Sequence, residues 1–188
     1  MRNKTPVFQV MVLFIFCALF KSDYNVRANE FKSAGSAVIL AYHRFGEGQF
    51  PSTSIRMEQF KSHIAELKRK RYNILPITEI VQKINDRKKL PDFTVGISID
   101  DAYSSVYEKA WPLLREAKIP FTLFISTDAV DRQATGYMSW DQIRELKSAG
   151  VTIGSQTKSH KHLPLISIED VKQEIDKANV RISREIGS

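Results

Sequence analysis

The stretch Phe93-Thr-Val-Gly-Ile-Ser-Ile-Asp-Asp101 joins a compact apolar run to two adjacent carboxylates. An apolar run of this length that follows Pro91 and ends at acidic residues predicts a buried strand. Three further apolar runs, at residues 37–42, 121–126 and 151–154, are also predicted to be strands, and helical patterns separate them. This alternation predicts the α/β class with a parallel sheet.

The helical segments are recognised by apolar residues at spacings of three and four. Pro112 predicts a kink or an early end in the segment that contains it, because proline removes a backbone donor and clashes with the preceding turn. Ser139 and Gln142 form a capping box, while Gly150 and Gly187 stand where glycine closes a helix. The predicted helices span residues 60–71, 78–85, 106–117, 139–149 and 167–186.

Length and composition exclude several classes of protein. A chain of 188 residues predicts about one domain and is too short for a complete eight-fold β/α barrel, which needs about 250 residues. A hydrophobic fraction of 43% with 26% charged residues excludes a disordered chain and a multi-span membrane protein. The single cysteine, Cys17, excludes an internal disulfide framework. The net charge of +7 comes without a basic stripe between aromatic residues, so no nucleic-acid partner is expected.

The N-terminus has the pattern of an export signal. Arg2 and Lys4 precede an uncharged, strongly apolar segment that ends before small residues suited to cleavage. We predict a signal peptide over residues 1–28, followed by one domain over residues 29–188, and a periplasmic or extracellular location. The alternative is an uncleaved anchor formed by residues 7–20, which is the one membrane contact expected.

Polar clusters follow three of the predicted strands. His43 and its neighbours follow the first strand, Asp100 and Asp101 the second, and the segment from Gln156 to His160 the fourth. Because the carboxyl ends of parallel strands meet at one edge of a sheet, we expect these clusters to lie together. Two crowded carboxylates push their pKa values apart, which suits one as a ligand and the other as a base.

Each cluster also has a structural explanation. An adjacent pair of aspartates at a strand end often caps a helix or forms a solvated turn, and His43 can be a hydrogen-bonded strand-end histidine. His160 and His162 can be exposed loop imidazoles, with His162 the more peripheral. His63 lies off the apolar face of its helix, and we expect a structural role for it.

Two strings resemble motifs of a known family. Ser98-Ile-Asp-Asp-Ala-Tyr103 is similar to Thr-Phe-Asp-Asp-Gly-Tyr, the first motif of the polysaccharide deacetylases (carbohydrate esterase family four, with a nodulation-type chitooligosaccharide deacetylase domain). Ile153-Gly-Ser-Gln-Thr-Lys-Ser-His160 is similar to the second motif, Gly-Ser-His-Thr-x-Ser-His. Residues 40–45, 120–125 and 138–143 resemble the family as well. The resemblance implies an incomplete, distorted (β/α) barrel of parallel strands with outer helices.

The resemblance also implies an activity. Members of this family are metal-dependent hydrolases that remove the N-acetyl group from poly- or oligosaccharides containing N-acetylglucosamine. By motif position, Asp100 is the general base and Asp101 and His160 are ligands of a divalent metal, with zinc the expected ion. We assign His43 a role in binding the carbohydrate substrate.

The sequence departs from the family pattern at three places. Gln156 stands where the family has a second ligand histidine, so metal binding, above all of zinc, is expected to be weaker. Ala102 replaces a glycine, which costs about 1–2 kcal/mol if the backbone there is left-handed. The later family motifs have no counterpart, so the resemblance covers the N-terminal part of the domain, truncated on its C-terminal side. The alternative function is therefore a catalytically inactive fragment or sugar-binding relic, and a third is an unrelated α/β hydrolase or lyase that uses His43 and Asp100.

Overall fold

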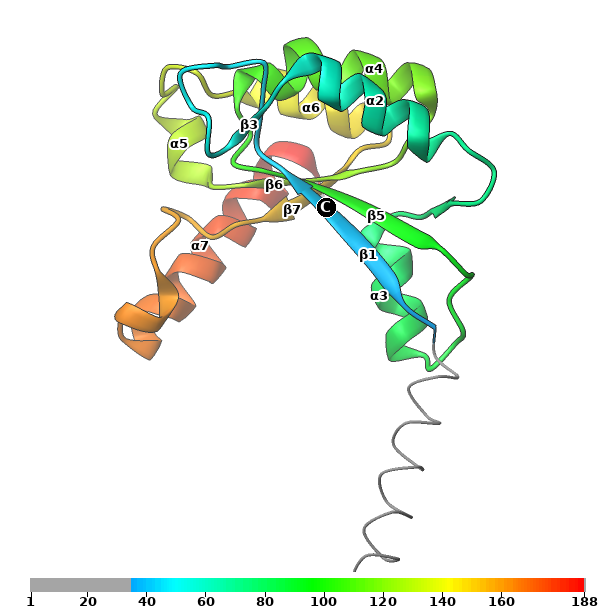
Figure 1. Ribbon diagram of the computed structural model, residues 1–188. Helices are drawn as coiled ribbons and strands as arrows, with labels where there is room; N and C mark the ends of the chain where they lie inside the picture. Colours follow the sequence, from blue (N-terminus) through cyan, green and yellow to red (C-terminus); the bar gives the residue numbers. More distant parts are fainter. Residues whose placement is uncertain (1–34, 188) are drawn as a thin grey trace, which may run out of the picture.

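The computed structural model describes residues 35–187. Its centre is one sheet in the order β1-β5-β6-β7, with β4 also paired to β5, and every pair is parallel (Figure 1). The α/β class with a parallel sheet is therefore confirmed. The strands are β1 (Ala37–Tyr42), β4 (Asn73–Ile74), β5 (Thr94–Asp100), β6 (Thr122–Ile125) and β7 (Thr152–Ser155).

Helices lie on both sides of this sheet. Helices α2, α4 and α6 cover one face, and α3 lies on the other side (Figure 1). Helix α7 packs along the edge at β7, and its C-terminal part contacts α6. The core fills the space under the first group, because alternate residues of the strands, such as Ile97, Ile99 and Leu123, are directed into it and are almost fully buried. The helices are α2 (Met57–Leu67), α3 (Ile77–Asn85), α4 (Trp111–Ala117), α5 (Thr127–Asp131), α6 (Trp140–Ser148) and α7 (Ile168–Ile186).

Several helix ends match the sequence predictions. Ser139 and Gln142 form the predicted capping box of α6. Gly150 follows α6 with a φ of 92°, and Gly187 ends α7 with a φ of 66°, a conformation that glycine adopts without strain. The sequence patterns missed the short elements α5, β4, β2 (Arg44–Phe45) and β3 (Ser54–Ile55), because two to five residues carry too little periodicity.

Two predicted helices need correction. The segment 106–117 is split into a π-helical turn, η1 (Val106–Ala110), and α4, whose first turn contains Pro112. The wider π-helical turn η1 comes just before Pro112, which has no backbone N–H and cannot donate a helical hydrogen bond. Helix α2 ends at Leu67, short of the predicted end near residue 71. Four consecutive basic residues follow this end, and two of them, Arg69 and Arg71, pair with Glu66 of the last helical turn.

The first strand is less buried than its apolar sequence predicts. Val38 is 59% exposed and Ile39 is 44% exposed, because β1 lies at one edge of the sheet. Over residues 35–187 the other edge is β7, so the sheet remains open, in agreement with the predicted incomplete barrel. Within residues 35–187 no helix is both long and apolar enough to cross a membrane. The predicted signal peptide (1–28), its alternative anchor (7–20) and Cys17 lie outside the described residues.

Candidate functional site

The carboxyl edge of the sheet brings the predicted site residues together. His43 follows β1 and Asp100 ends β5, and their side chains approach to 3.9 Å between Nε2 and Oδ2. Asp101 lies next along the chain, and its Oδ1 is 4.0 Å from Nε2 of His160. Gln156 directly follows β7, and its Oε1 accepts a hydrogen bond of 3.2 Å from the Asp101 backbone N–H. The structure thus joins segments that are up to 117 positions apart in the sequence, from residue 43 to residue 160.

The two adjacent carboxylates have different surroundings. Asp100 lies beside His43, whereas Asp101 lies beside His160. The backbone turns sharply between them and the next helix, with φ values of 74° at Asp101 and 51° at Ala102. Ala102 therefore occupies the left-handed region, which a glycine adopts without strain, and carries about 1–2 kcal/mol of strain.

Partial burial tunes the acidity of Asp100. Desolvation raises the pKa of this carboxyl above its ordinary value, His43 opposes the rise, and the neighbouring Asp101 adds to it. The carboxyl is still 21% exposed, so water can reach it. A carboxylate with a raised pKa is a stronger proton acceptor, which suits a general base.

His63 and His162 lie away from the contacts that His43 makes with Asp100 and His160 makes with Asp101. Nδ1 of His63 is 2.9 Å from the hydroxyl of Tyr42, which supports the expected structural role. His162 is exposed and precedes the 3₁₀ turn η2 (Leu163–Leu165). The side chain of His160 is 56% exposed, so solvent covers much of it even though it faces Asp101.

The donor atoms at this edge do not fit a three-ligand zinc centre. Catalytic zinc sites use three protein ligands and leave one position for water. Asp101 and His160 supply two donors, and the third position is held by Gln156, whose neutral amide oxygen is a weaker ligand for zinc than imidazole. Among the residues that the structure covers, 35–187, no group of three or more His, Cys, Asp or Glu side chains is arranged to hold a metal ion.

Sequence reasoning missed a stacked cluster beside the site. The guanidinium of Arg44 lies between two rings, 3.4 Å from the centroid of Tyr103 and 3.9 Å from that of Phe50. Glu47 binds Arg44 through one carboxylate oxygen and accepts a hydrogen bond from Ser105 through the other. Burial raises the pKa of Tyr103 far above its usual value, so it stays a neutral phenol. Phe50 lies in a loop without a local pattern, so nothing in the sequence pointed to it.

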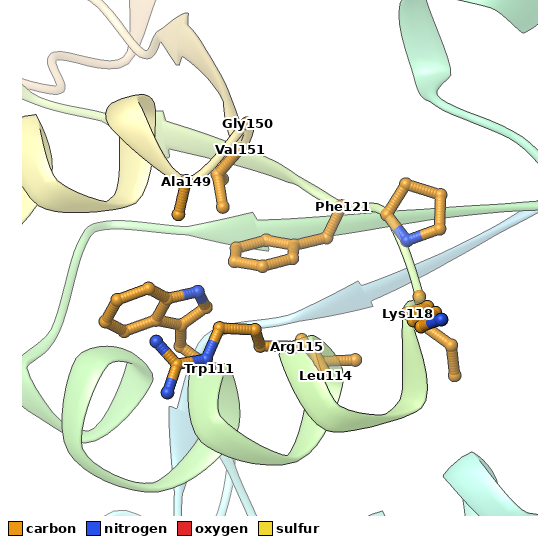
Figure 2. A pocket seen from close by; sticks show the side chains of 10 residues that line it. Trp111, Leu114, Arg115, Lys118, Phe121, Ala149, Gly150 and Val151 are labelled. Atoms are coloured by element: carbon orange, nitrogen blue, oxygen red, sulfur yellow. The ribbon is translucent and has the colours of Figure 1, made fainter.

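A pocket of about 370 Å³ lies elsewhere in the molecule, between α4 and the amino ends of β6 and β7 (Figure 2). Its lining includes Trp111, Leu114 and Arg115 from the helix, with Phe121 and Val151 directly before the two strands. The pocket is therefore at the opposite ends of the strands from Asp100 and is not part of the candidate site.

Comparisons with known proteins agree with the motifs. The poly-beta-1,6-N-acetyl-D-glucosamine N-deacetylase of Staphylococcus epidermidis is 29% identical over 140 residues, covering 64% of this chain and 48% of that protein. The chain spans about half the length, 43% to 48%, of the curated relatives it matches.

Solved structures share the fold. The Streptococcus pyogenes deacetylase PplD, solved in complex with acetate, matches with a TM-score of 0.73 at 17% identity, over 81% of this chain and 70% of that one. IcaB from Ammonifex degensii matches with a TM-score of 0.68 at 23% identity, over 82% and 72% of the two chains. The family model for polysaccharide deacetylases matches residues 87–188, which is more than half of the sequence. This chain belongs to the polysaccharide deacetylase family.

Proposed function

We propose that this chain hydrolyses the N-acetyl amide of polysaccharides or oligosaccharides that contain N-acetylglucosamine. The observation that carries the proposal is the meeting of His43, Asp100, Asp101 and His160 at one edge of the sheet. The last three stand in strings that resemble the family's motifs and lie within the region, 87–188, that the family model matches. The relative from S. epidermidis is named for poly-β-1,6-N-acetylglucosamine, so polymers of this sugar are the substrate class to test first.

The proposed reaction assigns the proton to Asp100. Its carboxylate removes a proton from a water molecule as the water oxygen attacks the acetamide carbonyl carbon. The tetrahedral intermediate then collapses with cleavage of the C–N bond, and the proton held by Asp100 is available to the leaving nitrogen. The products are acetate and the amine of the sugar, which carries the second proton of the water as an ammonium group. His43, 3.9 Å from Asp100, is placed to orient the substrate and to favour the charged form of the base.

The first experiment measures acetate release from β-1,6-linked N-acetylglucosamine oligomers, with and without added Zn²⁺ or Co²⁺. Asp100→Asn keeps the shape of the side chain but removes its basicity, so it is expected to abolish the release. The matched control is Asp92→Asn, an exposed aspartate that precedes β5, which should leave the rate unchanged. An unaltered rate in the Asp100→Asn variant would remove this residue from the mechanism.

A second candidate function is glycan binding without hydrolysis. The observation in its favour is Gln156, a neutral amide at the third ligand position, whose oxygen faces the Asp101 backbone N–H at 3.2 Å. This candidate predicts oligosaccharide binding in calorimetry, no acetate release, and no stoichiometric metal by elemental analysis. It also predicts that Gln156→His alone does not create activity. Tight one-to-one zinc binding by the purified chain would count against it.

We also propose that the chain is exported through residues 1–28. The support is the basic start and the apolar segment that follows it. N-terminal sequencing of the protein recovered outside the cytoplasm is expected to begin at Asn29. A mature protein that still begins at residue 1 and sediments with membranes supports the anchored alternative.

A further inference from the structure

Glu174 of α7 is a buried charge that the proposed chemistry does not use. Only 6% of this residue is exposed, which makes it the most buried of the charged side chains over residues 35–187. Burial of a carboxylate is costly unless hydrogen bonds replace the lost water. The hydrogen bonds that Glu174 accepts therefore show which part of the structure it stabilises.

Both carboxylate oxygens of Glu174 bind the residue next to His160. Oε2 accepts a hydrogen bond of 2.7 Å from the Ser159 backbone N–H, and Oε1 accepts one of 2.7 Å from the Ser159 hydroxyl. The backbone carbonyl of Glu174 also accepts the N–H of Lys158 at 3.0 Å. The ammonium group of Lys161 lies 3.8 Å from Oε1. One helical residue thus satisfies two successive amides of the loop after β7.

This loop needs external support. Thr157 and His160 have φ values of 66° and 57°, in the left-handed region that residues with a side chain rarely adopt. On its other side the loop is held through the Lys158 carbonyl, which accepts hydrogen bonds from the Asp128 N–H at 2.8 Å and the Ser126 hydroxyl at 3.1 Å. A strained backbone conformation persists only where contacts with the rest of the protein hold it, and these hydrogen bonds are such contacts.

The position of His160 depends on this backbone. Its imidazole is 56% exposed, so packing does little to hold the ring 4.0 Å from the carboxylate of Asp101. The N–H of His160 donates to the hydroxyl of Thr157 at 3.2 Å, which closes the loop on itself. Ser159 is the last residue before His160, and Glu174 accepts two hydrogen bonds from it.

We propose that Glu174 is a positioning residue, which acts through Ser159 to keep the imidazole of His160 opposite Asp101. The role of that imidazole in turnover rests on the proposed function, whereas the positioning itself does not. Glu174 does not touch the carboxylate pair. Its effect on any reaction is transmitted through the loop.

The test uses the full 188-residue chain and two variants of the glutamate. Glu174→Ala removes both acceptors. Glu174→Gln keeps an oxygen for the Ser159 N–H and can donate its amide hydrogen to the Ser159 hydroxyl. The control is Glu169→Ala, an exposed glutamate in the first turn of the same helix. NMR measures amide hydrogen exchange at Ser159 and the ring resonances of His160.

Loss of a hydrogen bond to a charged group predicts that Glu174→Ala speeds exchange of the Ser159 amide by roughly tenfold or more and shifts the His160 resonances. Glu174→Gln should restore most of both properties, and Glu169→Ala should change neither. Unchanged exchange at Ser159 and unchanged His160 resonances in Glu174→Ala would overturn the proposal. If that variant does not fold, Ser159→Ala replaces it; this variant loses the hydroxyl bond but keeps the backbone N–H bond, so a smaller shift of the His160 resonances is expected, and an unmoved ring again contradicts the role.

A kinetic measurement separates this proposal from the proposed function. If the chain releases acetate, Glu174→Ala should lower kcat roughly 10–100-fold, as for partners that orient site ligands, with KM little changed. In a chain that already carries His160→Ala, the same substitution should have no further effect, and an equal further loss would show that Glu174 does not act through His160. If the unaltered chain releases no acetate, the proposed function fails, while the NMR results still decide whether Glu174 positions the loop.

Discussion

The two loops that form the candidate site are held by different forces. The loop after β5, which carries Asp100 and Asp101, continues directly into the core, where Ile99 and Ala102 are fully buried. The loop after β7, which carries His160, lies partly in solvent and is held by polar contacts from Glu174 and from the start of α5. Apolar packing therefore places the carboxylates, and hydrogen bonds place the histidine. Substitutions that disturb the packing of the loop after β5 should lower the stability of the whole fold. Substitutions that remove the polar contacts of the loop after β7 should change only the local structure.

The largest effect is expected from a substitution that creates a cavity in the core next to the loop after β5. Ile99→Ala removes a side chain with no exposed surface and is expected to lower the free energy of unfolding by about 2–5 kcal/mol. Urea denaturation measures the change. Val81→Ala, on the exposed side of α3 where the side chain is 48% accessible, is the control and should cost far less. Similar losses for the two variants would show that the loop after β5 is not supported by the core.

The second loop should respond to acid. Burial alone would raise the pKa of Glu174, but the two hydrogen bonds from Ser159, together with the charges of Lys161 and Lys158, outweigh it and hold the pKa below its usual value. A lowered pKa in the folded state means that the stabilising contribution is complete above the unfolded pKa and disappears as the pH falls through the folded value. Protection of the Ser159 amide should thus persist at neutral pH and decline below about pH 4, near the ordinary glutamate pKa.

The corresponding control compares Glu174→Gln with the unaltered chain across the same pH range. Their difference in unfolding free energy should shrink toward zero in strong acid, because protonation removes the charge that distinguishes them. A difference that is constant from neutral to acidic pH would mean that the charge of Glu174 makes no contribution to the stability of the fold.

The free energy of unfolding should depend on pH in the opposite direction through Asp100. Burial raises its pKa, so the folded state binds the proton more tightly than the unfolded state does. Stability should fall as the pH rises from the unfolded pKa through the raised folded value, at about 1.4 kcal/mol for each unit of difference. Asp100→Asn is therefore expected to stabilise the fold at neutral pH while it removes activity. Calorimetric melting at pH 7 checks this, and a lower Tm for Asp100→Asn would contradict it.

The smallest expected effect on stability comes from the backbone turn at Ala102. Ala102→Gly relieves the left-handed strain of about 1–2 kcal/mol, but it adds freedom to the unfolded chain and removes a fully buried methyl group, each worth about 0.5–1 kcal/mol, so a net change near zero is expected. Ala117→Gly, in the last turn of α4, is the matched substitution and should lose roughly 0.5–1 kcal/mol. Urea unfolding of both variants gives the comparison, and equal losses would show that the turn at Ala102 is unstrained.

The regular elements were predictable because their signals are local. Apolar runs located β1, β5, β6 and β7 to within a residue or two, and the capping box of Ser139 marked the start of α6. The meeting of the polar clusters at one edge also followed from the sequence, since parallel strands must place their carboxyl ends together. The exposure of Val38 did not follow, because nothing local shows that a strand lies at the edge of its sheet.

The side-chain contacts of the site could not be predicted in the same way. Gln156 stands at a ligand position by motif, but only the fold shows its oxygen accepting the Asp101 N–H. Glu174 looks like one more polar residue on an amphipathic helix, and its burial against Ser159 arises from the packing of α7 beside β7. The stack of Arg44 between Phe50 and Tyr103 likewise joins separate segments.

The amino-acid sequence by itself determined the order of strands and helices, the motif residues and their common edge, because periodicity, caps and parallel connection act over short distances along the chain. The tertiary structure decided which carboxylate faces which histidine, which polar group is buried, and what holds the second loop. Those features depend on atoms of distant segments approaching within hydrogen-bond distance, and only the packed chain brings them there.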